Sequence, residues 1–355
     1  MGVRMKLECK PDFDVVAERW EAFWRGQNER PMVGAEIPRA GVTPIEKPGY
    51  AALAAGDLEP VIDRLLAWAE THEFLGDSIP FFYLEFAADH FASLLGADLD
   101  FPEGQEGGWA VPFVEDLDRA EIRFDRDGKW WRRTLECAEA LRARCDGKLL
   151  IASPSLVANL DALSAIYGPQ KLLFALVDNP DGVQRELDQI DRAFAEIVDA
   201  FAEMLDYGQF GSINRHGMYT RGRTNVLQCD FSYMISPEMF REFVVPHLAR
   251  EMEQLDAVEY HLDGPGAIRH VEALCEMERL DVVQWVAGAG GPAEQDWIWL
   301  YDRIDELGKG QFLGGDTATV KARWAKYRSR KLYFRVRGIE SDAQMEEYME
   351  TLESK

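Results

Sequence analysis

The chain has 355 residues, of which 47% are hydrophobic and 11% aromatic, so it can bury a large core. Its 63 acidic and 39 basic residues give a formal net charge of -24, which repels phosphate backbones and excludes nucleic acid as an expected partner. The five scattered cysteines form no CxxC pair, and no apolar stretch approaches the roughly 20 residues of a membrane span. We therefore expect a cytoplasmic globular protein without a membrane partner.

The N-terminal part of the chain reads as a helical extension followed by the first strands and helices of a domain. Apolar residues at helical spacing predict a helix over 13–24, and Arg30-Pro31 ends this extension at residues 1–30. Residues 74–80 and 96–118 read as loops. The other elements expected here are strands over 32–37 and 148–152 and helices over 58–72 and 130–145.

From residue 179 onward, short apolar runs alternate regularly with amphipathic segments. Strands are expected over 224–229, 258–262, 282–286, 311–313 and 332–336. Helices are expected over 180–205, 237–255, 267–276, 296–307, 320–329 and 342–352. Such alternation indicates βαβ units and a parallel sheet. The strand-like runs number near eight, which favours an α/β fold consisting of a single (β/α)8 TIM barrel over residues 1–355. No GxGxxG motif follows the first strand, which argues against dinucleotide binding.

An active site in a parallel barrel is built at the C-terminal ends of its strands. His261 and Asp263 stand two residues apart where the run 258–262 ends, so both side chains should share one face. They could ligate a divalent metal, or His261 could exchange protons while Asp263 orients it; a loop histidine held by a carboxylate is the plain alternative. Other polar or aromatic residues at such ends are Asp77, Ser153, Asn159, Arg215, His216, Asp230, Tyr233, Gln284, Trp285, Arg335 and Arg337.

Several of these residues suggest roles in binding or catalysis. Asp77 and Asp230 could hold a cationic group or exchange protons, although a helix cap or a turn would also account for each. Trp285 offers a flat wall to a ligand, with core packing as the alternative. The residues expected to line the substrate pocket are Asn159, Tyr233, Gln284 and Trp285.

Four segments together resemble the uroporphyrinogen decarboxylase superfamily, which also contains the methyl-corrinoid:coenzyme M methyltransferases. They are Phe74-Leu75-Gly76-Asp77-Ser78-Ile79-Pro80, the run from Asp230 to Phe240 with Phe243 and Pro246, the His261-Leu262-Asp263-Gly264 strand end, and residues 332–352. The resemblance implies a single (β/α)8 barrel from about residue 15 onward. It also implies that Asp77 matches a substrate-gripping aspartate.

The chain departs from both branches of that superfamily. The decarboxylases carry an Arg-x-x-Gly-Arg pattern near the N-terminus, which is missing from residues 30–39. The methyltransferases hold zinc with a His-x-Cys strand end and a late cysteine, where this chain has Asp263 and Arg337-Gly338. A carboxylate would make the site a harder one than a thiolate does. A third ligand could come from Asp77, Asp230 or Glu85, or the site could lack a metal.

The resemblance implies an enzyme that transfers a methyl group to or from a small substrate, with a corrinoid protein as partner or methyl source and zinc at His261 and Asp263. One alternative is a metal-free decarboxylase or other lyase, in which Arg337 and Arg39 grip substrate carboxylates. Another is a catalytically silent protein that binds a tetrapyrrole or a corrinoid. A homodimer is one oligomeric state to test.

Overall fold

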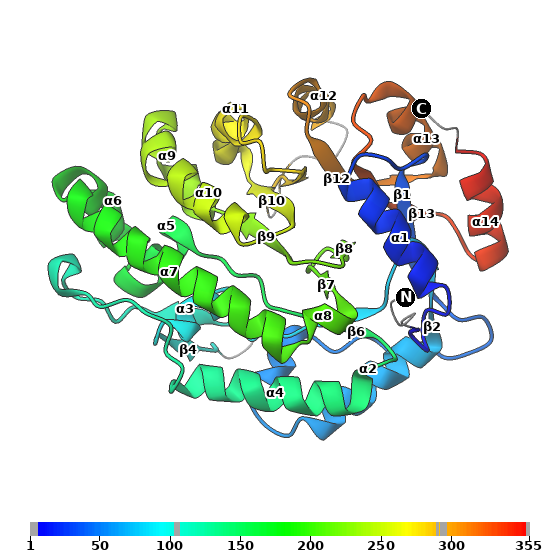
Figure 1. Ribbon diagram of the computed structural model, residues 1–355, viewed down its shortest axis with the longest axis horizontal. Helices are drawn as coiled ribbons and strands as arrows, with labels where there is room; N and C mark the ends of the chain where they lie inside the picture. The colour runs from blue at the N-terminus through cyan, green and yellow to red at the C-terminus, as the bar shows by residue number, and fades with distance from the viewer. Residues whose placement is uncertain (1–5, 103–106, 289–290, 292–296, 353–355) are drawn as a thin grey trace.

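The structure, a computed structural model, describes residues 6–102, 107–288, 291 and 297–352. Within these ranges the chain forms a mixed α/β fold around a seven-stranded sheet (Figure 1). Neighbouring strands are parallel except β1 and β2, which are antiparallel. In spatial order the strands are β2 (His72–Gly76), β1 (Met32–Pro38), β13 (Leu332–Arg337), β12 (Gly310–Asp316), β11 (Val282–Val286), β10 (Ala257–Asp263) and β9 (Thr224–Gln228).

Shorter strands form three separate pairs. These are the parallel pair β3 (Phe81–Tyr83) with β6 (Leu150–Ala152), and the antiparallel pairs β4 (Asp98–Asp100) with β5 (Trp109–Val111) and β7 (Ser212–Ile213) with β8 (Tyr219–Thr220). Single 3-10 turns are η1 (Tyr50–Leu53), η2 (Leu117–Arg119), η3 (Asp230–Met234) and η4 (Pro265–His270).

Helices cover the sheet and build most of the core. The N-terminal ones are α1 (Phe13–Trp24), α2 (Glu59–Thr71), α3 (His90–Leu94), α4 (Lys129–Cys145), α5 (Asn159–Tyr167), α6 (Pro169–Asp178) and α7 (Pro180–Met204). The later ones are α8 (Tyr207–Phe210), α9 (Pro237–Phe243), α10 (Val245–Glu253), α11 (Val271–Cys275), α12 (Ile298–Glu306), α13 (Thr317–Lys326) and α14 (Asp342–Glu350). Among the described residues, no helix combines the length and the apolar character that a membrane crossing requires.

The strand and helix alternation predicted for the C-terminal half is confirmed, but the closed barrel is not found. In the described strands the hydrogen-bonded ladder runs from β2 to β9 and stops there. The gap between β9 and the segment after β6 is crossed by a side chain: the Asn225 amide donates to the Pro154 carbonyl at 2.9 Å and accepts from the Leu156 N–H at 3.1 Å. Between β9 and this segment, a buried side-chain amide thus takes the place of a ladder of backbone hydrogen bonds.

Some local predictions need correction. The predicted loop 74–80 begins with strand β2, which pairs antiparallel with β1. The helix predicted over 237–255 is two helices that meet at Val244, because Pro246 in the first turn of α10 has no N–H to continue α9. Helices α5 and α6 were not predicted, and the predicted helix start at residue 296 lies outside the described residues.

Helix α1 covers the N-terminal edge of the sheet. Its large side chains, including Phe13, Trp20 and Trp24, share one cluster of buried residues with Met32, Leu150, Ala257 and Val282, which open or nearly open their strands. The Trp24 indole donates to the Tyr219 carbonyl at 2.7 Å, which ties α1 to β8. One end of the parallel strands is therefore filled by aromatic side chains, and the C-terminal ends are left to build a site.

Candidate functional site

His261 and Asp263 lie on one face at the end of β10, and Asp230 follows the neighbouring strand β9 directly. The register pairs His261 with Gln228 and with Gln284 on the two flanking strands. Donor atoms of Asp230, His261 and Asp263 all lie within 4.8 Å of one another. Of the three acids considered as a third ligand, the structure thus brings Asp230 to the predicted pair.

Gln284 sets the orientation of the His261 ring. Its side-chain oxygen accepts a hydrogen bond from Nδ1 of His261, so Nδ1 carries the hydrogen and Nε2 keeps a lone pair. Nε2 lies 4.0 Å from Oδ2 of Asp263. Burial, with a smaller effect of the Arg215 charge, lowers the pKa of His261 to about 3. The imidazole is therefore neutral near pH 7 and presents Nε2 as a base or a ligand.

The two carboxyls beside His261 hold protons more readily than usual. Burial, followed by the charges of Asp161 and Asp263, raises the pKa of Asp230 to about 7, although part of the residue is exposed. Burial also raises the pKa of Asp263. Oδ1 of Asp263 is buried and accepts no hydrogen bond from the described residues. A bound cation would neutralise these crowded carboxyls and give the unused oxygen of Asp263 a partner.

This donor set fits a divalent cation. It offers one imidazole nitrogen whose opposite nitrogen is fixed by a hydrogen bond, and two carboxylates, one of them with an orphaned oxygen. Nitrogen and oxygen donors suit zinc and the other first-row divalent metals, and they exclude a thiolate-rich site. Cys229, next to Asp230, is buried, and its thiol pKa lies well above the usual range because of that burial.

A chain of polar side chains lies behind Asp230, and of its members only Arg215 was expected from the sequence. Arg215 donates to the Gln228 oxygen at 2.7 Å, and the Gln228 amide donates to Oδ2 of Asp230 at 2.9 Å. Asp161 accepts the N–H groups of Asp230 and Phe231 at 2.8 Å each, which fixes the start of η3. These contacts hold Asp230 in place. Gln228 lies inside an apolar-looking strand, so only its predicted position near a strand end could have indicated it.

His216 forms a second polar pair next to His261. Its Nδ1 lies 2.8 Å from Oε1 of Glu259, a fully buried residue that also accepts from the Asn214 amide at 2.8 Å. The ring centroids of His216 and His261 are 6.0 Å apart. Glu259 sits two residues before His261 on β10, so one strand positions both rings.

Tyr233 lies over the turn that follows β10. A Cβ atom at Gly266 would come within 2.5 Å of the Tyr233 ring, and Gly264 has a φ of +78°. Both glycines are therefore required by the local backbone and by the ring above it. Tyr233 itself is 52% exposed. The structure places this predicted pocket residue at the rim, beside the Asp263 end of the strand.

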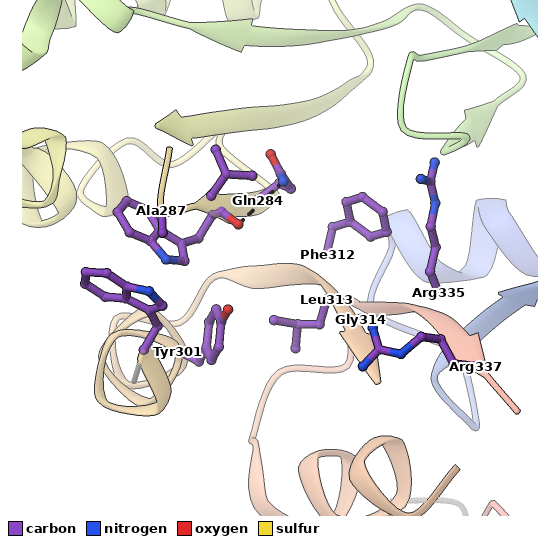
Figure 2. A pocket seen from close by; sticks show the side chains of 11 residues that line it. Gln284, Ala287, Tyr301, Phe312, Leu313, Gly314, Arg335 and Arg337 are labelled. Carbon is purple, nitrogen blue, oxygen red and sulfur yellow. Dashed lines mark hydrogen bonds between the residues drawn. The ribbon is translucent and has the colours of Figure 1, made fainter. Parts of the chain in front are cut away.

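A cavity of about 540 Å³ opens beside Gln284. We call it the tryptophan cavity, because Trp285 and Trp297 line it at 4.9 Å between ring centroids. Figure 2 shows Arg335 and Arg337 reaching from the same strand along its border, opposite Tyr301 and Ala287. Gly314 leaves room for Arg337, whose Nη1 would lie 3.4 Å from a Cβ at that position. The other described residues that line this cavity are Gln284, Val286, Phe312 and Leu313.

A second cavity, of about 370 Å³, lies on the other side of Arg335. We call it the cationic cavity, because Lys47, Arg215 and Arg335 line it together with His216. Arg335 borders both cavities, Gln284 links His261 to the first, and His216 links it to the second. The donor cluster lines neither cavity, but His261 lies next to one lining residue of each.

Three other predicted site residues lie apart from this cluster. Asp77 is fully buried at the α1 edge, where Arg19 and Arg30 each donate to its carboxylate at 2.7 Å. Asn159 is buried behind β9 and donates to the Gln228 carbonyl at 3.0 Å and to Glu251 at 3.1 Å. Arg39 lines a different cavity from Arg337, so these two arginines do not grip one ligand.

The polarity of β2 explains the misplacement of Asp77. A strand that runs parallel to its neighbours ends at the edge where the donor cluster lies, but β2 runs antiparallel to β1 and ends at the opposite edge. Burial alone would raise the pKa of Asp77, yet the charges of Arg30 and Arg19 and the Val33 N–H hold it below the usual range. Asp77 therefore fastens α1 to the sheet.

The sequence matches no protein-family model and no curated protein. Among solved structures, the chain is similar to a methyltransferase from Methanosarcina mazei, with a TM-score of 0.60 and 12% sequence identity. The match covers 94% of this chain and 98% of the other. At this identity the likeness concerns the fold, so the resemblance to the uroporphyrinogen decarboxylase superfamily stays a prediction. The chain thus shares the fold of a methyltransferase over nearly its whole length.

Proposed function

We propose that this protein is a methyltransferase that acts on a small molecule and holds a divalent metal, zinc being the first to test, at Asp230, His261 and Asp263. The observation that carries the proposal is the donor cluster at the C-terminal edge of the parallel strands, where His261 lies next to lining residues of two cavities. The likeness in fold to a methyltransferase supports the reaction class.

The side chains suit the activation of a hydroxyl or thiol acceptor. Gln284 keeps Nε2 of His261 unprotonated and aimed toward Asp263. Asp230, whose pKa burial raises to about 7, would release its proton when a cation binds and then serve as a carboxylate ligand. Gln228 holds that carboxylate from behind. When bound, a divalent cation would supply Lewis acidity that lowers the pKa of the acceptor.

A corrinoid carried by a partner protein is the methyl source we propose. This part rests on the sequence resemblance and on the shared fold. A carboxy-lyase reaction is the second candidate, because the cationic cavity would suit a substrate that carries carboxylates. A lyase would release carbon dioxide without any methyl donor, so the two reactions are separated by their products.

The test combines metal binding with methyl transfer from methylcobalamin. We expect the wild-type chain to bind about one equivalent of Zn²⁺ or another divalent metal, and His261→Ala and Asp263→Asn to lower this affinity at least about 100-fold. Both variants should lose methyl transfer to thiol and phenol acceptors, followed by the absorbance of the demethylated corrinoid. Asp100→Asn, an exposed aspartate on β4, is the matched control and should behave as wild type.

Two results would contradict the proposal. One is binding of less than about 0.1 equivalent of every divalent metal tried, with no gain in activity on adding metal. The other is unchanged methyl transfer in His261→Ala. Retained corrinoid affinity in a wild-type chain that transfers no methyl group would favour the silent binding protein.

A further inference from the structure

The cationic cavity gathers positive charge in a strongly acidic chain. Lys47, Arg215 and Arg335 line it, and Glu36 is the one acid among its described lining residues. Oε1 of Glu36 already accepts a hydrogen bond from the Trp68 indole at 2.8 Å. The formal net charge of the whole chain is -24. Local charge in this cavity is therefore opposite in sign to that of the molecule.

None of these three cations has a carboxylate at ion-pair distance among the described residues. The Lys47 ammonium lies 4.4 Å from the ring centroid of Trp68 and 4.5 Å from that of Phe81. Nε of Arg215 is buried without a hydrogen-bond partner in the described part of the chain. Arg335 donates to the His216 carbonyl at 3.2 Å. Lys47 and Arg215 are partly buried and Arg335 is exposed, and no described carboxylate forms an ion pair with any of the three, so the cavity is electrostatically complementary to an anion.

The remaining walls are flat and apolar. Aromatic rings from four separate segments line the same cavity: Trp68, Phe74, Phe81, Tyr83 and Tyr333. Phe312, stacked on Tyr333 at 5.0 Å between centroids, extends this surface beneath Arg335. Rings and cations in one small cavity favour a ligand with a planar body and a charged end.

The ligand would lie beside the donor cluster. His216 lines the cavity, and its ring centroid is 6.0 Å from that of His261. A planar acid held by Lys47 and Arg335 would occupy the cavity that His216 also lines.

We propose that the cationic cavity binds a small aromatic carboxylate, with Lys47 and Arg335 holding the carboxylate group. The identification of this ligand as the methyl-accepting substrate rests on the proposed function. The binding of the ligand to the cavity does not depend on that function. Burial lowers the pKa of Lys47 to about 8, Glu36 opposing and Arg335 adding to this effect, so the ammonium is charged at neutral pH.

Binding is measured by isothermal titration of metal-free protein with benzoate, using benzamide as a neutral analogue of the same shape and acetate as a carboxylate without a ring. Benzoate should bind at least about 10-fold more tightly than either, because one charged hydrogen bond contributes roughly a factor of 10 or more. Lys47→Met keeps the aliphatic stem and should weaken benzoate binding about 10- to 100-fold. Lys321→Met, at an exposed position on α13, is the matched control.

The pH dependence provides a second readout. Benzoate affinity of the wild type should fall as the pH rises through about 8, where Lys47 loses its proton, and this decrease should be missing in Lys47→Met. The charged or titratable groups that face Lys47 are Glu36 on β1 and Arg335 on β13, with Tyr83 on β3 and Arg215 and His216 on the same cavity.

The inference is overturned if benzamide binds as tightly as benzoate, if Lys47→Met binds benzoate like wild type, or if benzoate shows no saturation by about 10 mM. Circular dichroism and thermal unfolding check that each variant is folded. Benzoate binding without methyl transfer would support the anion site and contradict the proposed reaction. Methyl transfer without benzoate binding would support the proposed reaction and contradict the anion site.

Discussion

Gln284 determines which nitrogen of His261 is available. Its side-chain oxygen accepts the Nδ1 hydrogen, and the burial that lowers the pKa of His261 to about 3 keeps the ring neutral. A buried histidine without this acceptor could turn its ring or exchange the protonated nitrogen. The side-chain amide of Gln284 on β11 thus leaves Nε2 of His261 on β10 free to bind a metal or a proton.

Gln284→Leu tests this arrangement. We expect the Zn²⁺ affinity to fall about 10- to 100-fold, as for other partners that orient metal-bound histidines, and Gln284→Glu to recover much of it because it restores an acceptor. Competition with a chromophoric chelator measures both. Benzoate affinity should not change, because Gln284 does not line the cationic cavity. Wild-type metal affinity in Gln284→Leu would show that the hydrogen bond does not position the ring.

At the scale of elements, α1 is held in place by a charged contact. Asp77 follows β2 and receives hydrogen bonds from Arg19 on α1, from Arg30 after α1 and, at 2.9 Å, from the N–H of Val33. The Trp20 indole donates to the Asp77 carbonyl at 3.1 Å. One residue thereby joins the helix, the start of β1 and the end of β2.

Asp77→Asn should destabilise the fold by about 3–5 kcal/mol, because it leaves two largely buried arginines without a counter-charge. Urea unfolding at pH 7 measures the free energy. Glu18→Gln, on the exposed side of α1, should change it by less than about 0.5 kcal/mol. The depressed pKa of Asp77 means that its contribution is present above its usual pKa and is lost as the pH falls through the lower folded value. A small effect of Asp77→Asn at pH 7 would contradict this role.

The elements show what sequence patterns could and could not predict. Periodicity located α1 at its observed limits and β11 as well, because apolar spacing reports burial directly. Periodicity missed β2, because β2 begins at His72 directly after α2 with no turn residue between them. The sequence of a single strand also does not show whether the strand runs parallel or antiparallel to its neighbour. The end that Asp77 occupies was therefore unpredictable. Asp230 and His261 were predictable because both lie at the C-terminal ends of parallel strands.

The cationic cavity could not have been predicted in the same way. Lys47, Arg215 and Arg335 lie in three distant parts of the chain, and each reads locally as an exposed charge. Their convergence depends on how β1, the β7–β8 turn and β13 meet, which is a property of the tertiary structure. Among the described residues no carboxylate forms an ion pair with them, and this also appears only in three dimensions.

At the scale of the whole molecule, acidic groups limit stability at high pH. Glu85 is buried, and that burial raises its pKa to about 7, with the Ser155 N–H and Arg215 acting in the opposite direction. Because the folded pKa lies above the unfolded one, this stabilising contribution is complete below about pH 4.5 and is lost as the pH rises through about 7. The formal net charge of -24 adds repulsion in the same direction.

Glu85→Gln should therefore flatten the pH dependence of stability. Between about pH 5 and about pH 8, the unfolding free energy of the wild type should decline by on the order of 2–3 kcal/mol more than that of the variant. The amide can still accept the hydrogen bond that the Ser155 N–H makes at 3.0 Å. Glu278→Gln, at an exposed position, serves as the control. Parallel pH profiles for Glu85→Gln and wild type would show that Glu85 ionises normally.

The contacts between the two ends of the chain constrain the order of folding during synthesis. Strand β1 has β13 as its parallel neighbour, and the Asn28 amide donates to the Arg330 carbonyl across 302 residues of sequence. During synthesis, the amphipathic N-terminal helix and the open edge of β1 therefore lack these partners until nearly the whole chain has emerged from the ribosome. A truncated or stalled product would expose the aromatic face of α1, so such fragments should be recognised by chaperones that bind apolar segments.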